Sequence, residues 1–127
     1  MLEQAEGLGI EVLKTERQLP MLLHQKLGAE MASRLFGACR EVQNAIGCHT
    51  TLKAASTPLE QLIFLADKLA SFEANEFGAL PALEETVERS LSEGCVLTLL
   101  HYWTHRADFK VVHPWLEAAW EEFLPVR

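Results

Sequence analysis

Residues 57–70 constrain the fold of this chain more than any other segment. Thr57 precedes Pro58, and Glu60 follows three positions after Thr57. A threonine cap, a proline in the first turn and a glutamate that can hydrogen-bond back to the cap together mark the start of a helix. Beyond it, apolar residues recur around most of the helix circumference, at Leu59, Leu62, Ile63, Leu65, Ala66, Leu69 and Ala70. The pattern predicts a helix that is largely buried.

Helical periodicity continues through the rest of the chain. It predicts helical segments at residues 2–8, within 11–19, and at 20–36, 38–46, 81–107 and 114–124, with a loop over 71–80. Gly37 is placed to end the 20–36 helix, and Gly94 either breaks the 81–107 helix or lies within it. The predicted core stripe of the 20–36 helix is Leu23, Leu27, Met31 and Leu35. Because no alternating strand pattern is present, we expect one all-α domain over residues 1–127.

Composition and charge limit the classes of partner. With 49% hydrophobic and 23% charged residues, the 127-residue chain is typical of a soluble globular domain. Its formal net charge of −7 argues against a nucleic-acid-binding protein, which needs a basic face. The chain has no apolar run of membrane-span length and no secretory pattern at its start, so we expect no membrane contact and a cytoplasmic location. The odd, widely spaced Cys39, Cys48 and Cys95 fit reduced thiols.

Asp67 is the first candidate functional residue, because it lies inside the predicted buried helix. A carboxylate in such a place needs a cation or several hydrogen bonds, since desolvating a bare charge is costly. A metal ion would supply that charge. An ion pair with Lys68 or Lys53 is an equally good explanation.

Two histidines are candidate partners of Asp67. His49 follows Gly47, where a helix is expected to end, so its imidazole is free to point into a cleft. His24 lies beside the predicted core stripe, and Gly28 one turn later leaves space for a neighbouring group. Two imidazoles and one carboxylate from three successive helices suit a first-row metal ion. A hydrogen-bonded structural histidine is the alternative at both positions.

Candidate substrate contacts lie next to these ligands in the sequence. They are Lys53, Lys26 and Thr50, and an ammonium group near the metal can offset charge on a transferring phosphoryl group. Lys53 is the preferred contact, and a solvated lysine is the alternative for Lys26.

The C-terminal third contains a second histidine pair. His101 and His105 are one helical turn apart, which is the spacing of two imidazoles on one metal ion. Tyr102 stands where the zincin signature requires a glutamate, so we favour surface or aromatic packing over metal binding. Trp103, Trp115 and Trp120 are predicted to pack between the last two helices, with an interface as the alternative.

Three sequence blocks, taken together and in order, resemble a known family. They are LLHQKLGA at 22–29, NAIGCHTT at 44–51 and IFLADK at 63–68. These blocks resemble the HD-superfamily metal-dependent phosphohydrolases, and most of all the bacterial symmetrical diadenosine-tetraphosphate hydrolases. The resemblance implies an HD-like helical bundle and a small nucleotide substrate, diadenosine tetraphosphate, which is cleaved to two ADP.

The same resemblance assigns roles to individual residues. His24, His49 and Asp67 fall on metal-ligand positions, and Lys53 falls where the family keeps a basic residue. The implied cofactor is a divalent metal, iron in our expectation, with manganese, zinc or nickel as alternatives. We expect the oligomeric state to be a homodimer.

One departure from the family pattern limits these assignments. Members of this family carry, ahead of the first block, an earlier histidine and a His-Asp doublet that supply the remaining ligands. This chain contains no His-Asp pair. It therefore resembles the C-terminal portion of the HD domain without the family's N-terminal helices, and no catalytic residue can be assigned in it. The alternative is a non-catalytic helical module for binding or dimerisation, derived from the HD scaffold.

Overall fold

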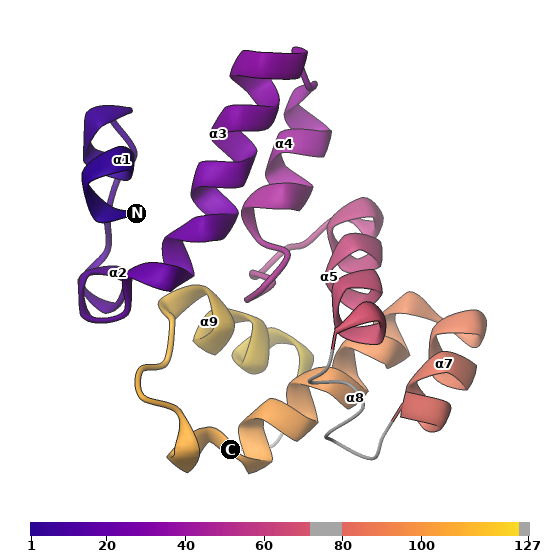
Figure 1. Cartoon of the computed structure of the whole chain (residues 1–127). Helices are drawn as coiled ribbons and strands as arrows, with labels where there is room; N and C mark the ends of the chain where they lie inside the picture. The colour runs from indigo at the N-terminus through magenta and orange to yellow at the C-terminus, as the bar shows by residue number, and fades with distance from the viewer. Residues whose placement is uncertain (72–79, 125–127) are drawn as a thin grey trace.

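The computed structural model describes residues 1–71 and 80–124, and within these ranges the secondary structure is helical with no strand (Figure 1). The α-helices are α1 (Leu2–Gly7), α2 (Lys14–Gln18), α3 (His24–Phe36), α4 (Arg40–Gly47), α5 (Pro58–Ala70), α7 (Leu80–Arg89), α8 (Leu91–Thr104) and α9 (Pro114–Phe123). Short 3₁₀ helices, η1 (Pro20–Leu23) and η2 (Arg106–Asp108), precede α3 and follow α8. The all-α prediction is confirmed. The loop predicted at 71–80 falls mostly outside the described residues, and Leu80 already belongs to α7.

The local signals for helix ends are confirmed at two positions. Gly37 adopts the left-handed conformation with φ +64°, which only glycine reaches without strain, and α3 ends there. At the start of α5, Thr57 Oγ1 accepts a hydrogen bond from the Glu60 amide at 3.2 Å, and Glu60 Oε1 accepts one from the Thr57 amide at 2.8 Å. Residue types and their spacing were sufficient to predict these helix ends, because each signal acts within one helical turn.

The break in the predicted 81–107 helix occurs at Ser90 and not at Gly94. Ser90 caps α8 by accepting a hydrogen bond from the Glu93 amide at 3.2 Å. Gly94 lies inside α8, where an added Cβ would sit 2.9 Å from Val87 Cγ2 and 3.1 Å from Leu65 Cδ1. The glycine therefore permits close packing of α8 against α7 and α5, and does not end a helix.

The main core lies where α5, α7, α8 and α9 meet. Phe64 and Leu65 of α5, Leu99 of α8 and Ala119 of α9 have no exposed surface. A smaller core joins α1, η1 and α3, and its buried members are Ala5, Leu23 and Leu27. Each described helix is too short or too polar to cross a lipid bilayer.

Helices α3 and α4 form a hairpin that projects from the rest of the chain (Figure 1). A Cβ at Gly28 would sit 3.3 Å from Ile46 Cγ2, so the glycine lets the two helices approach closely, as the sequence predicts. Because consecutive helices in a hairpin run antiparallel, the start of α3 lies beside the end of α4. His24 and His49 occupy those two ends.

The distal half of α3 is more exposed than its apolar pattern predicts. Met31 is 49% exposed, Leu35 66% and Phe36 84%. The predicted core stripe is therefore wrong for Met31 and Leu35, although it holds for Leu23 and Leu27. The physical reason is that the hairpin extends beyond α1, and no other described helix covers its outer end (Figure 1).

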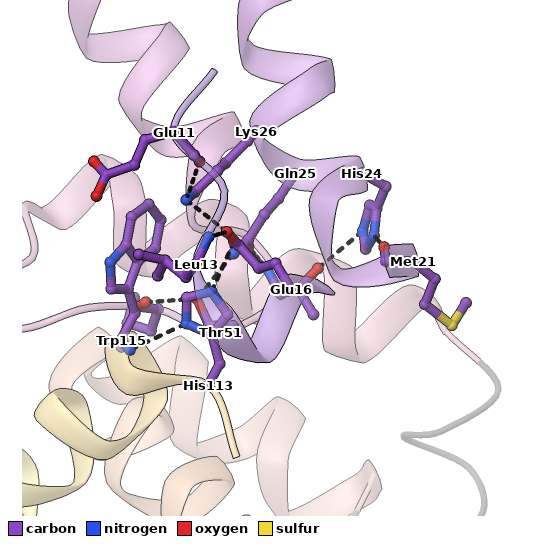
Figure 2. Close-up of polar contacts among 12 residues, drawn as sticks. Glu11, Leu13, Glu16, Met21, His24, Gln25, Lys26, Thr51, His113 and Trp115 are labelled. Carbon is purple, nitrogen blue, oxygen red and sulfur yellow. Dashed lines mark hydrogen bonds and ion pairs between the residues drawn. The ribbon is translucent and has the colours of Figure 1, made fainter. Parts of the chain in front are cut away.

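A buried ion-pair network ties the N-terminal segment to the start of α9. Glu16 of α2 has no exposed surface and lies between Lys26 and His113 (Figure 2). Its Oε1 accepts hydrogen bonds from Lys26 Nζ and the Leu13 amide, both at 2.8 Å. Its Oε2 accepts one from His113 Nε2 at 2.9 Å. His113 in turn caps α9, because its Nδ1 accepts a hydrogen bond from the Trp115 amide at 3.1 Å.

The surroundings of Glu16 hold its carboxyl group in the ionised form. Burial by itself raises the pKa of Glu16, but the hydrogen bonds from Lys26, His113 and the Leu13 amide outweigh burial and lower the pKa from its ordinary value of 4.5. Since the pKa is lower in the folded state, the unfolded state binds more protons in acid. This contribution to stability is therefore present above about pH 4.5 and is lost as the pH falls through the folded-state pKa.

We expect Glu16→Gln to lower the free energy of unfolding at pH 7 by about 1–2 kcal/mol, because the amide cannot serve Lys26 and His113 together. The variant should also show a flatter loss of stability below pH 4.5 than the wild type. Urea unfolding at a series of pH values measures both effects. Glu3→Gln, at an exposed position of α1, is the matched control. Parallel acid profiles for wild type and Glu16→Gln would contradict the prediction.

Candidate metal centre

His24 and His49 meet at the open end of the α3–α4 hairpin and are called the histidine pair below. Their Nε2 atoms are 3.1 Å apart, and the ring centroids are 4.9 Å apart in an edge-on arrangement. His24 begins α3, and His49 follows the residue that ends α4. The prediction that two histidines from successive helices converge is thus matched by the geometry of these two side chains.

In each ring, the hydrogen bond made by Nδ1 determines the protonation of the facing Nε2. His24 Nδ1 donates a hydrogen bond to the Met21 carbonyl at 2.7 Å (Figure 2), and His49 Nδ1 donates one to the Ile46 carbonyl at 2.6 Å. A carbonyl oxygen can only accept, so both protons must sit on Nδ1. In two neutral imidazoles, the facing Nε2 atoms then carry lone pairs. Two lone pairs at this distance repel each other, and either a proton on one Nε2 or a metal cation bound by both removes the repulsion.

This arrangement fits a metal ion. Metal-bound histidines usually donate their second ring N–H to a carbonyl or a carboxylate, as both rings do here. Metal–nitrogen bonds of 2.0–2.1 Å at angles between 90° and the tetrahedral value place two nitrogens about 2.8–3.4 Å apart. The observed 3.1 Å lies within that range. The histidine pair can therefore hold two adjacent coordination positions once the Thr50 hydroxyl group, 2.9 Å from His24 Nε2, turns away from that nitrogen.

Thr50 and Gln25 hold the turn that carries His49. Thr50 Oγ1 donates a hydrogen bond to His24 Nε2 at 2.9 Å. Gln25 has no exposed surface, and its Oε1 accepts from the Thr50 amide at 3.0 Å while its Nε2 donates to Thr51 Oγ1 at 3.2 Å. The next residue, Leu52, has φ +59°, a backbone conformation that residues other than glycine rarely adopt. The chain therefore turns sharply after Thr51, and Gln25 fastens that turn to α3.

Asp67 does not complete a three-ligand cluster. In the described ranges, no three His, Cys, Asp or Glu side chains lie close enough together to hold one metal ion. The Asp67 side chain is 43% exposed, so the predicted burial is wrong, although Phe64 and Leu65 of the same helix have no exposed surface. Its Oδ2 pairs with Lys68 Nζ at 3.1 Å, which is one of the two ion pairs that the sequence left open.

Lys68 connects Asp67 to the histidine pair through the main chain. Its side chain is 4% exposed, and its Nζ donates to the His49 carbonyl at 3.4 Å. The same ammonium lies 4.8 Å from the Phe64 ring centroid, which helps to stabilise the buried charge. Asp67 thus stands beside the His49 turn without touching an imidazole nitrogen, and its assignment as a ligand stays a prediction.

The predicted substrate contacts separate into two places. Thr50 lines a pocket of about 420 Å³ next to the histidine pair, which we call the Thr50 pocket. Lys26 and Lys53 line a second pocket of about 290 Å³. There Lys26 pairs with Glu16 at 2.8 Å, and Lys53 pairs with Glu60 at 3.0 Å. Of the three predicted contacts, Thr50 is therefore the one that adjoins the candidate metal centre.

The second histidine pair has a simpler arrangement. His101 and His105 stack with ring centroids 4.3 Å apart, and His105 Nδ1 donates to the His101 carbonyl at 2.9 Å. Burial, and then the neighbouring His105, lower the pKa of His101. The packing of tryptophans between α8 and α9 is seen for Trp103 and Trp120, whose centroids are 5.3 Å apart. Trp115 instead lies under Lys26, with the Lys26 Nζ 5.0 Å from its centroid.

The buried cysteines are poor nucleophiles. Burial, and then the charge of Glu60, raise the pKa of Cys48 to about 11, and burial raises that of Cys95 to about 12. Both thiols are buried and protonated at neutral pH. Cys39 is exposed, and all three are free thiols.

Gln25, Glu16 and His113 were missed by reasoning from the sequence. Gln25 follows His24 directly and has no exposed surface, but nothing in its neighbours shows that it faces another turn. His113 before Pro114 was a visible helix-start signal, and its capping role was within reach of the sequence. Its contact with Glu16 spans 97 positions and has no local signal.

Comparisons with known proteins place this geometry in context. Residues 3–71 match the family model described as HD domain, and that range contains both histidines and Asp67. A protein of Lactococcus lactis subsp. cremoris, described as an uncharacterized protein in the pepC 5′ region, is 37% identical over 118 residues. The match covers 91% of this chain and 58% of that protein, so the chain spans less than two thirds of the relative's length. No solved structure matches the chain significantly.

Proposed function

Because the chain belongs to the HD domain family, we propose that it is a metal-dependent phosphohydrolase which cleaves diadenosine tetraphosphate symmetrically into two ADP. The observation that supports the proposal most is the pair of facing Nε2 atoms 3.1 Å apart. That arrangement suits metal coordination, and HD domain proteins generally bind divalent metals. The choice of diadenosine tetraphosphate rests on the resemblance of the three sequence blocks.

We propose iron as the resident ion, although imidazole ligands also suit manganese, zinc and nickel. When bound, such an ion lowers the pKa of water toward neutrality and polarises a phosphoryl oxygen. The chain itself holds His24 and His49 in one tautomer and one orientation through the Met21 and Ile46 carbonyls. Thr50 keeps a hydroxyl group against the histidine pair, where it can turn toward a phosphate oxygen.

The Thr50 pocket supplies a place for the substrate. Its volume of about 420 Å³ lies within the usual range for small-molecule sites. Apolar side chains from η1 and α9 and the aromatic Tyr102 and Phe109 provide walls for a nucleoside, and Lys68 and Lys110 provide positive charge. This combination favours a ligand with one flat apolar part and one anionic part.

Product analysis tests the proposal. The 127-residue chain, loaded with Fe²⁺ or Mn²⁺ under anaerobic conditions, is incubated with diadenosine tetraphosphate, and nucleotides are separated by ion-exchange chromatography. We expect two ADP per substrate at a low rate, because the histidine pair holds one side of a centre that takes further ligands. Formation of ATP with AMP, or no ADP above the level of a His24→Ala/His49→Ala double variant, would contradict the proposal.

The exposed end of α3 favours a second candidate function. Met31, Leu35 and Phe36 form an apolar surface that a non-catalytic binding or dimerisation module would use. The product assay separates the two candidates, because such a module forms no ADP with any metal. The proposed homodimer is compatible with both.

A further inference from the structure

The Thr50 pocket is built about equally from the range that matches the HD domain and from the part of the chain outside it. One part of the lining comes from the matched range of residues 3–71, through Leu19, Leu22, Thr50, Thr51 and Lys68. The opposite wall comes from α8, the connector after η2 and α9, through Tyr102, Phe109, Lys110, Val111, His113 and Leu116. The C-terminal helices therefore shape the ligand site in addition to covering the core.

The charge of this pocket differs from that of the whole chain. The chain carries a formal net charge of −7, yet the described residues that line the pocket include Lys68 and Lys110 and no Asp or Glu. A cleft lined by one sign of charge raises the local concentration of ligands of the other sign. The pocket is thus suited to an anion, although the chain as a whole repels anions.

The two pocket lysines are not equivalent. Lys68 is buried, and its ammonium already contacts Asp67 and the His49 carbonyl. Lys110 is exposed, and within residues 1–71 and 80–124 its side chain has no hydrogen bond or ion pair. Lys110 can therefore accept a ligand without losing an existing interaction, whereas Lys68 cannot.

The backbone before Lys110 is held in place by the turn after α8. The Asp108 amide donates to the His105 carbonyl at 3.0 Å, and the Phe109 amide donates to the Arg106 carbonyl at 3.2 Å. The Phe109 ring packs edge-on against Tyr102 with centroids 5.9 Å apart. On the other side, His113 is anchored to Glu16 at 2.9 Å. The connector thus places Lys110 in the lining of the pocket, where its ammonium group has no ion pair with any described residue.

We propose that Lys110 binds phosphate groups of a nucleotide held in the Thr50 pocket. This inference rests on the proposed function for the identity of the ligand and adds the residue that recognises its charge. Phosphates lie toward Lys110 and Thr50, and the nucleoside packs along Phe109, Leu116 and the other apolar walls. Lys110 is thus a binding residue contributed from outside the matched domain.

Titration calorimetry with ADP and with adenosine tests this role on the full chain in the presence of EDTA. We expect Lys110→Ala to weaken ADP binding about tenfold or more, because a charge-assisted hydrogen bond to phosphate is lost. Adenosine binding should change less than twofold. Lys14→Ala is the matched control, because Lys14 is also exposed and makes no side-chain hydrogen bond or ion pair within the described ranges.

Three outcomes would overturn the inference: wild type that does not bind ADP at millimolar concentration, equal ADP affinity in Lys110→Ala and Lys14→Ala, or equal losses for ADP and adenosine. Thermal unfolding of Lys110→Ala should match that of wild type, which excludes a folding defect. Because EDTA removes all metal, this experiment is independent of hydrolysis. If Lys110→Ala binds ADP like the control but the chain still cleaves diadenosine tetraphosphate to two ADP, the role of Lys110 is wrong and the proposed function is supported. If Lys110→Ala loses ADP affinity but no hydrolysis occurs, the nucleotide pocket is supported and the proposed function is wrong.

Discussion

His49→Ala is expected to abolish stoichiometric binding of a divalent metal ion, with a loss of affinity of about 100-fold or more. The histidine pair places its two Nε2 atoms 3.1 Å apart, and removing one imidazole leaves the other as a single ligand. Loss of supporting groups around a metal centre typically costs 10–100-fold in affinity, so loss of a ligand should cost at least as much. Equilibrium dialysis with Mn²⁺ or Zn²⁺, followed by plasma mass spectrometry, measures the effect.

The second histidine pair supplies the matched control for this variant. His105→Ala removes an imidazole from an i, i+4 pair on α8 and should leave metal binding unchanged. His24→Ala should equal His49→Ala, and the double variant should bind no worse than either one, because the two rings act as a unit. If His49→Ala keeps its metal affinity and His105→Ala loses it, the metal site lies at the second histidine pair and this prediction is wrong.

Gln25→Leu is expected to damage both stability and metal binding, although Gln25 contacts neither metal nor substrate. Leucine matches glutamine in size but leaves the Thr50 amide and Thr51 Oγ1 without their present partner. Thr51 Oγ1 keeps its hydrogen bond to the Leu52 carbonyl at 2.8 Å, so the Thr50 amide is the group left unsatisfied. An unsatisfied buried group costs about 1–3 kcal/mol, and we expect a loss of that size in the free energy of unfolding. Release of the His49 turn should weaken metal binding about 10–100-fold.

A variant with the same chemistry elsewhere on the hairpin separates these effects. Gln43→Leu changes a half-buried glutamine of α4 whose side chain makes no hydrogen bond within the described part of the chain. It should alter the free energy of unfolding by less than about 0.5 kcal/mol and leave metal affinity unchanged. Metal affinity in Gln25→Leu equal to that of wild type, measured on folded protein at low temperature, would show that Gln25 has only a structural role.

Local signals predicted the helices well because each depends on neighbours within a turn or two. The Thr57–Glu60 cap and the left-handed Gly37 are of this kind. The sequence left open whether Gly94 breaks a helix or lies within one, because its lack of a side chain serves packing against Val87 and Leu65, and such contacts are not encoded nearby in the sequence.

The sequence predicted some residues of the candidate site correctly and others not, again according to how local their contacts are. His24 and His49 could be paired because a short hairpin forces the start of α3 beside the end of α4. Asp67 was assigned to the buried face of an almost wholly apolar helix, and only the packing of α5 against α8 and α4 decides which side stays open. The contact between Glu16 and His113 joins the two ends of the chain and leaves no trace in local pattern.

The central claim is that His24 and His49 coordinate one metal ion together. X-ray absorption fine structure of the chain loaded with one equivalent of Zn²⁺ tests it most directly, because imidazole rings give a characteristic outer-shell scattering. We predict two imidazole nitrogens at about 2.0–2.1 Å in the wild type and one in His24→Ala. Fewer than two imidazoles in the wild type, or the same spectrum in His24→Ala, would contradict the claim.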